Sequence, residues 1–376
     1  MTEVKGQAVA RARGDRAGGS GAWLEFDLHG RATMRVQAAA ATASILAEMF
    51  APFRATGLAA HDVTVTGQLQ PLREPSHAEH EYRYSDQALH LLKSNVQVET
   101  DGADFRVHGT RELLTTVLPL IDCVAVQRDA AMFHAATFAY RGAGIALPAW
   151  GGVGKTSTIA KLVRVDGVEF MGDDWAFASG DGQILGYAKP MFIKPHHRPI
   201  YPHLFEKRRK PLIPKTLSKP VAEFTTLVHP LVTKYPHLAG FTRRWSPEHM
   251  MVTPQQALPH AKIATAAPLR ASIFVERFDG SSAVLTEQTT EWMVSRMIGN
   301  FHSELARHSR DVLTALGATG LVPIHTFFAE KAEVFRRALA DKPAALLRVP
   351  AAWSADRASD VIVENVLRSV EAADQR

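Results

Sequence analysis

The feature that most constrains this 376-residue chain is a glycine-rich loop placed between an apolar run and an amphipathic run. Residues 144–147 predict a strand, and the apolar positions Ile159, Leu162 and Val163 predict a helix that packs on it. The loop between them reads Ala149-Trp150-Gly151-Gly152-Val153-Gly154-Lys155-Thr156. Glycines let such a backbone curl until several N–H groups point at one phosphate, and the positive end of the following helix adds to the attraction. This order of strand, loop and helix predicts a phosphate-binding loop.

Each position of this loop has an expected role, and the expected cofactors are ATP and Mg²⁺. Lys155 would reach the β- and γ-phosphates, and the Thr156 hydroxyl would bind the magnesium. The pattern usually begins with glycine where Ala149 stands, and alanine fits there unless the position needs a positive φ. The alternative is a flexible turn with a solvated Lys155. The expected nucleotide-binding residues are Gly151, Gly152, Val153, Gly154, Lys155, Thr156 and Ser157.

An acidic pair, Asp173 and Asp174, follows the apolar run 168–171. Carboxylates at the carboxyl end of a neighbouring parallel strand face the phosphate loop in doubly wound sheets. One acid would bind the metal together with Thr156, and the other would accept the proton of an attacking hydroxyl. The sequence leaves open which acid has which role. The alternative is that the pair forms a turn, or binds magnesium through water.

The rest of the chain divides by its patterns into four parts. Residues 1–20 lack hydrophobic periodicity and predict a disordered lead. A small α+β domain is expected at 21–110, an α/β nucleotide-binding domain at 111–350, and a tail or helix at 351–376. We expect strands at 23–28, 62–66, 81–84, 96–99, 105–108, 133–140, 144–147, 168–171, 271–275 and 344–349. We expect helices at 37–50, 111–126, 287–305, 307–316 and 329–340.

A basic insertion is predicted at 189–260. Between residues 189 and 219 there are nine Lys or Arg residues against one acid, and six prolines interrupt any regular element. The run Lys207-Arg208-Arg209-Lys210 would clamp phosphates or attract an acidic substrate, and a solvated basic face is the alternative. Arg243, Arg244 and Arg277 are candidates for a positive charge near the transition state, and nothing local selects among them.

Composition excludes several classes of function. No apolar run reaches the 18 or so residues of a transmembrane helix, and no signal-peptide stretch is present, so no membrane is expected. The single cysteine, Cys123, cannot form an internal disulfide, which agrees with a cytoplasmic protein. A net charge of +5 spread over this length is too small to predict nucleic-acid binding. The sequence is silent on oligomeric state and compatible with an oligomer.

Three features occur in a specific order: His134 within Met132-Phe133-His134-Ala135-Ala136, the loop at 152–156, and Gly172-Asp173-Asp174. Together they resemble the HPr kinase/phosphorylase family, bacterial serine kinases whose core is shared with phosphoenolpyruvate carboxykinase. The resemblance covers residues 113–186 and the strand around 273–277. It implies an HPr kinase-like core with a smaller N-terminal α+β domain. It also implies a catalytic set of Asp173, Asp174, His134 and Lys155.

By this resemblance His134 would lie beside the loop and orient the acidic pair or contact the transferred phosphate. The alternative is a histidine at a strand start whose hydrogen bonds are satisfied. The family usually has serine where Gly151 stands, and its C-terminal Glu and Arg signature for phosphorolysis is not found here. A kinase is therefore favoured over a phosphorylase, and HPr is not expected as the acceptor.

Three functions stay open from the sequence. The leading one is an ATP-dependent kinase that transfers the γ-phosphate to a hydroxyl, the serine of a peptide or protein. The second keeps this chemistry with a small-molecule acceptor. The third is an ATP-binding regulator without catalysis.

Overall fold

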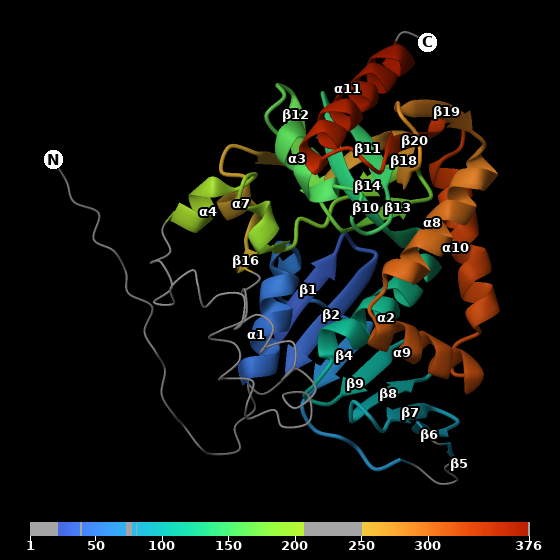
Figure 1. Cartoon of the computed structure of the whole chain (residues 1–376). Coiled ribbons are helices and arrows are strands. Elements are labelled where there is room, and N and C mark those ends of the chain that lie inside the picture. The colour runs from blue at the N-terminus through green and yellow to red at the C-terminus, as the bar shows by residue number, and fades with distance from the viewer. Residues whose placement is uncertain (1–21, 38–39, 73–76, 80, 207–249, 375–376) are drawn as a thin grey trace, which may run out of the picture.

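The computed structural model describes residues 22–37, 40–72, 77–79, 81–206 and 250–374 (Figure 1). Over these ranges the chain is a mixed α/β protein with two mixed sheets of nine strands each. The predicted lead 1–20 and the basic run 207–210 lie outside the described residues. None of the described helices combines the length and the apolar character needed to cross a membrane.

The first sheet is formed by the N-terminal strands, in the order β3-β1-β2-β4-β9-β8-β7-β6-β5. Strand β2 has alternating buried and half-buried residues, as expected of a sheet with one face on a core. The bounds are β1 Leu24–Leu28, β2 Ala32–Gln37, β3 Arg54–Ala55, β4 Val63–Thr66, β5 His77–Ala78, β6 Tyr82–Ser85, β7 Ala88–Leu91, β8 Val96–Thr100 and β9 Phe105–His108. Helices α1 (Ala40–Met49) and α2 (Leu113–Gln127) accompany this sheet, and α2 contacts β2, β4 and β9 (Figure 1).

The second sheet has the order β17-β12-β10-β13-β14-β18-β20-β19, and β11 pairs with both β10 and β18. Every residue of β10 is buried, because the strand has neighbouring strands in the sheet and helices α2, α3, α8 and α10 all contact it. The bounds are β10 Ala130–Tyr140, β11 Ala143–Pro148, β12 Val168–Gly172, β13 Trp175–Ser179, β14 Gln183–Leu185, β17 Lys262–Ile263, β18 Ala266–Phe278, β19 Val284–Gln288 and β20 Ala344–Pro350.

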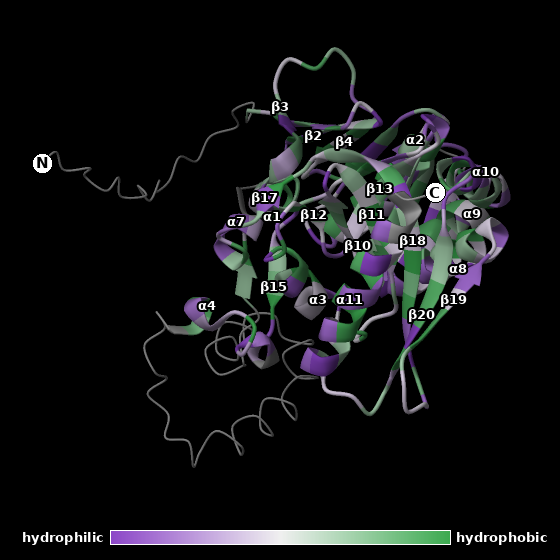
Figure 2. Cartoon of the chain, turned by 90° about the horizontal axis from the view of Figure 1, so that it is seen from above, coloured by the Kyte–Doolittle hydropathy of each residue, from purple (hydrophilic) through white to green (hydrophobic). Residues whose placement is uncertain are grey.

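Helices cover both faces of the second sheet. Helix α11 (Ala355–Asp374) buries Ala358, Ile362, Val366 and Val370, a spacing of four that forms one apolar stripe against α3 (Lys155–Leu162). Figure 2 shows the hydrophobic colour along β18 and β20 and the mixed colouring of α11. The other face carries α8 (Thr290–Glu304) and α10 (Ile324–Ala338), while α9 (Arg307–Ala318) packs against α2, α10 and strand β7 of the first sheet. Helix α11 occupies most of the segment 351–376, for which a tail or a helix was expected.

The described ends of the predicted insertion 189–260 contain short elements. Strands β15 (Met191–Ile193) and β16 (Met250–Val252) pair with each other, apart from both large sheets. The same described ends contain a 3₁₀ turn at Pro195–His197 and the short helices α4 (Pro202–Glu206) and α7 (Pro254–Ala257). Another 3₁₀ turn, at Ala51–Phe53, follows α1 in the N-terminal part of the chain. The described part of the insertion therefore contains short strands and helices between its irregular segments.

One hydrophobic core extends from the first sheet to a face of the second, from Phe26 to Leu346. Polar contacts also join the two sheets. His29 Nε2 lies 2.8 Å from Gly186 O, and the Arg31 guanidinium donates to Ser179 Oγ at 2.8 Å. Tyr187 packs its ring on Phe50 and Phe53 and donates its hydroxyl to Met49 O at 3.1 Å. The N-terminal sheet thus supports the segment around residues 186–189.

Candidate functional site

The glycine loop, residues 149–156, links β11 to α3 in the order that the sequence predicts. Gly152 and Gly154 have φ of +80° and +112°, in the region that favours glycine. Ala149 is not among the residues with positive φ, and it is fully buried beside Val275. Alanine is compatible with this position because its backbone does not need the freedom of glycine.

Lys155 begins α3, and its side chain turns back onto the glycine loop. The ammonium donates to Ala149 O at 2.7 Å and to Trp150 O at 3.2 Å. Burial lowers the pKa of Lys155, although the carboxylates of Asp174 and Glu304 act in the opposite direction. The loop carbonyls therefore hold a cation at the position where the sequence predicts a phosphate contact.

The acidic pair lies at an interruption between two strands. Strands β12 and β13 both pair antiparallel with β10, with Gly172 opposite Thr137 and Trp175 opposite His134. Asp173 and Asp174 fall between them, opposite the middle of β10, where Ala135 N donates to Asp174 O at 3.0 Å. One detail of the prediction is wrong, because β12 is not the neighbour of β11: β10 lies between them. Strands β11 and β12 both run antiparallel to β10, so they are parallel to each other. Their carboxyl ends still lie close together, because Pro148 pairs with Ala135 and Gly172 pairs with Thr137.

His134 and Lys189 both contact the Asp174 carboxylate. His134 Nε2 lies 3.0 Å from Asp174 Oδ1, and Lys189 Nζ lies 2.9 Å from Asp174 Oδ2. Only 4% of each of these two side chains is exposed, against 37% for Asp174. Burial acts to raise the pKa of Asp174, but the Lys189 ammonium and the His134 hydrogen bond outweigh it and hold that pKa well below its ordinary value.

Asp173 is in a different electrostatic position from its neighbour. Burial raises the pKa of Asp173 above its ordinary value, although the Lys189 ammonium acts to lower it. Among the residues that the structure describes, its carboxylate has no hydrogen-bond or ion-pair partner. Of the two acids, Asp173 is the one whose carboxylate is open to a new partner.

Helix α8 contributes two polar side chains, one turn apart. Asn300 is fully buried and donates its amide to Ala149 O at 3.1 Å. Its amide oxygen therefore faces His134 Nδ1 at 3.3 Å, on the side of the ring opposite to Asp174. Glu304 accepts a hydrogen bond from Gly151 N through Oε1 at 2.6 Å, and its Oε2 lies 4.0 Å from His134 Nε2.

These groups border one cavity of about 370 Å³. It is lined by His134, Gly151, Gly152, Gly154, Lys155, Thr156, Ser157, Asp173, Asp174, Lys189, Phe192, Lys194, His197, Ile200, Glu304 and Ala355. Among the described residues, no group of three or more His, Cys, Asp or Glu side chains could hold a metal ion by itself.

The structure brings together most of the predicted site residues. The predicted catalytic residues and the predicted nucleotide-binding residues line the cavity, except Val153, whose side chain is buried in the core. Arg277 instead donates to Pro350 O at 2.9 Å, away from the cavity lining, and Arg243 and Arg244 lie outside the described residues.

Three site residues were missed by the sequence prediction: Lys189, Asn300 and Glu304. Asn300 and Glu304 continue the stripe of Met293 and Met297 along the buried face of α8. Polar residues in such a stripe are a usable signal, because a buried polar group needs a partner. Lys189 carries no local signal, since it reads as one more charge in a basic segment.

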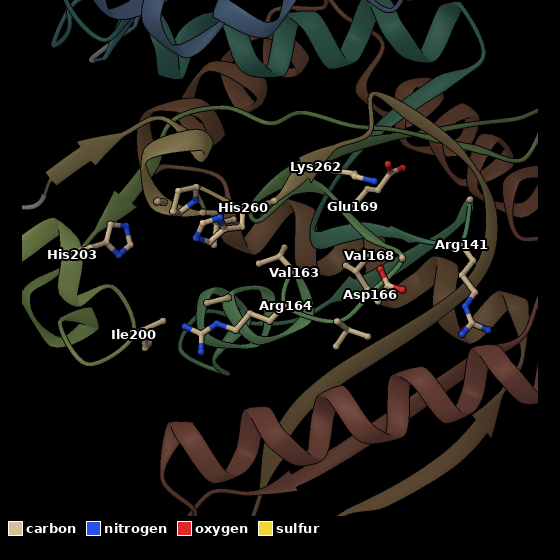
Figure 3. A pocket seen from close by; sticks show the side chains of 18 of the residues that line it. Arg141, Val163, Arg164, Asp166, Val168, Glu169, Ile200, His203, His260 and Lys262 are labelled. Atoms are coloured by element: carbon tan, nitrogen blue, oxygen red, sulfur yellow. The ribbon is translucent and has the colours of Figure 1, made fainter. Parts of the chain in front are cut away.

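A second, larger pocket of about 920 Å³ lies at the other end of α3, and Ile200 borders both cavities. Figure 3 shows Glu169 and Lys262 side by side on β12 and β17, and Arg141 at the opposite end of the pocket from His203. The pocket has both apolar and charged walls.

The chain matches no protein-family model, and no curated protein sequence matches it.

Proposed function

We propose that this protein is an ATP-dependent kinase that transfers the γ-phosphate of ATP to a hydroxyl, with the serine of a peptide or protein as the leading acceptor. The observation that carries the proposal is the single cavity in which the glycine loop and Lys155 face Asp173, Asp174 and His134. This combination of a phosphate-binding half and a proton-accepting half is what phosphoryl transfer requires. It also supports a relation to HPr kinase-like proteins, which stays part of the proposal.

The glycine loop and the start of α3 supply the phosphate-binding half. The amides of Gly152 and Gly154, together with the N-terminal end of α3, would attract the phosphate oxygens. Lys155 would exchange the carbonyls of Ala149 and Trp150 for oxygens of the β- and γ-phosphates. No large movement of the backbone is needed, because the ammonium already lies within its own loop.

The residues of the cavity fit Mg²⁺ as the partner of ATP. Magnesium keeps several waters and is bound by one or two carboxylates plus substrate phosphates, so a complete protein cage is not required. Thr156 and the acidic pair would be the protein ligands, with Asp174 the first choice because its carboxylate stays charged. When bound, the ion supplies positive charge that offsets the charge of the phosphates.

The acidic pair divides the remaining work. Lys189 and His134 fix Asp174 as an anion, so it is suited to hold position rather than to take up a proton. Asp173 has the raised pKa and an open carboxylate, and it would accept the hydroxyl proton. The acceptor oxygen bonds to the γ-phosphorus, the bond from that phosphorus to the β,γ-bridging oxygen breaks, ADP leaves, and the proton passes to Asp173.

Transfer of label from γ-labelled ATP tests this function. The protein is incubated with magnesium and an extract of its source cells that has been separated by a size cut-off. The Lys155→Ala variant is the negative control. Lys161→Ala is the matched control on the same helix, where Lys161 pairs with Asp356 and Asp360 outside the cavity.

Label in the large fraction, lost in Lys155→Ala and kept in Lys161→Ala, is the expected result. Label in the small fraction alone would identify a small-molecule acceptor instead. ATP binding without transfer to either fraction would contradict a kinase and favour a regulator.

A further inference from the structure

A carboxylate side chain of the protein, that of Glu304, contacts the glycine loop. Glu304 is the last residue of α8, and its Oε1 accepts a hydrogen bond from Gly151 N at 2.6 Å. A β-carbon placed on Gly151 would lie 3.5 Å from both Glu304 carboxylate oxygens, so the two groups are in direct contact. Gly151 belongs to the glycine loop, to which the proposed function assigns phosphate binding, and it lines the same cavity.

The position of Glu304 is fixed by the helix that carries it. One turn earlier, the buried Asn300 amide bonds to Ala149 O and faces His134. Met297 and Phe301 of the same helix are buried in the core. The last turn of α8 is therefore anchored to the beginning of the glycine loop and to β10, and only 23% of the Glu304 side chain is exposed.

This carboxylate changes what the loop can bind. A free phosphate oxygen that approaches the Gly151 amide meets a negative charge at hydrogen-bond distance, in a partly enclosed cavity where repulsion is poorly screened. Lys155 balances one negative charge, and a nucleoside triphosphate carries several. A triphosphate that arrives with a divalent cation carries less net charge, and hard cations favour carboxylate oxygens.

We propose that Glu304 is a specificity-determining residue that makes the glycine loop select the divalent-cation complex of a nucleoside triphosphate over the metal-free anion. This inference rests on the proposed function, because it assumes that the loop binds phosphates. It concerns binding only, and it is independent of whether any phosphate is transferred.

The affinity of ATP is measured by isothermal titration calorimetry, with Mg²⁺ and with EDTA, for the wild type and for Glu304→Gln. Glutamine keeps the shape of the side chain and an oxygen that can accept from Gly151 N. The matched control is Glu291→Gln, which removes the same charge from the first turn of α8, where Glu291 pairs with Arg336 at 2.7 Å. The two glutamates are thirteen positions apart on the same helix, which places them about 20 Å apart along its axis.

We expect Glu304→Gln to bind metal-free ATP about tenfold more tightly, and to bind the magnesium complex no more tightly than the wild type does. The ratio of the two affinities then falls at least about tenfold, while Glu291→Gln keeps the wild-type ratio.

An unchanged ratio in Glu304→Gln would overturn the inference, as would an equal loss of both affinities, which would mean that Glu304 only supports the loop. If the wild type binds magnesium-ATP selectively but transfers no label, the kinase proposal fails and the role of Glu304 stands. If no variant binds ATP in either form, both fail.

Discussion

Two Asp–Lys pairs attached to strand β10 have the same chemistry in different surroundings. Asp122 on α2 and Lys331 on α10 form an ion pair in which both side chains are 0% exposed. Asp174 and Lys189 form the second pair, at the cavity, where 37% of the Asp174 side chain remains exposed. The first pair is in the core, where Asp122 contacts the backbone of β10, and the second lies beside His134, near the middle of the same strand.

The two pairs differ in how many of their charged atoms are enclosed by other groups of the protein. Asp122 also accepts a hydrogen bond from Met132 N at 2.7 Å, and the Lys331 ammonium lies 3.2 Å from the centre of the Phe301 ring. The core pair is fully enclosed by the protein, whereas Asp174 faces a cavity next to the open Asp173. The same two residue types stabilise the architecture in one place and prepare a binding site in the other.

The largest expected effect is on the core pair. Asp122→Asn leaves the Lys331 ammonium buried without its counter-charge, and we expect the free energy of unfolding to fall by about 3–5 kcal/mol. Urea denaturation measures this change. Replacing both partners with Asp122→Leu and Lys331→Met should recover more than half of the loss. A single variant within about 1 kcal/mol of the wild type would show that the pair is not a stabilising unit.

At the cavity we expect a substitution to reduce activity without reducing stability, unlike the substitution in the core pair. Asp173→Asn should lower transfer from ATP by about a hundredfold, because the proposed proton acceptor is removed. Its free energy of unfolding should be equal to or above that of the wild type at pH 7.5, since burial raises the pKa of Asp173 and so disfavours its charged form in the fold. Steady-state kinetics and urea denaturation on the same preparation check both halves. A destabilised Asp173→Asn would mean that the carboxylate is structural.

His29 gives a third case, a partly buried titratable group whose Nε2 lies 2.8 Å from the carbonyl oxygen of Gly186. Burial lowers the pKa of His29, despite its bond to Gly186 O and the nearby Asp27. The folded state then disfavours the charged ring, so the stabilising effect is complete above about pH 6.5 and is lost as the pH falls below that value. The free energy of unfolding should fall less steeply with acidity in His29→Gln. Identical slopes would contradict this account of the contact between the sheets.

The smallest effect is expected at Ala149. Ala149→Gly restores the usual first residue of the loop pattern, yet the alanine backbone is not at positive φ. We expect the affinity for magnesium-ATP to change by less than about threefold. A larger gain in affinity, measured by calorimetry, would show that the alanine constrains the loop.

The sequence predicted elements best where the pattern is local. Strand β9 begins and ends where it was expected, at Phe105 and His108, and the strands expected at 133–140 and 144–147 correspond to β10 and β11. The helix expected at 287–305 is wrong at its start, because Val284–Gln288 is the strand β19. Most of β19 is exposed, so alternation could not reveal it, and its pairing with β20 is a tertiary interaction.

The same limit applies to the site. The glycine loop is contiguous in the sequence and could be predicted from its residues alone. The contact of His134 with Asp174 depends on the pairing of β10 with β13, and only a family resemblance indicated it beforehand. Lys189 and Glu304 reach the cavity through packing of distant elements, for which no local pattern exists.

The central claim is that the cavity has a phosphate-binding half and a proton-accepting half that can be separated. It is tested most directly by measuring the affinity for magnesium-ATP and the rate of transfer together, in the wild type, Lys155→Ala and Asp173→Asn. We predict that Lys155→Ala loses binding and transfer, whereas Asp173→Asn binds within about threefold of the wild type and transfers about a hundredfold more slowly. Full transfer by Asp173→Asn, or no binding of ATP by the wild type, would contradict the claim.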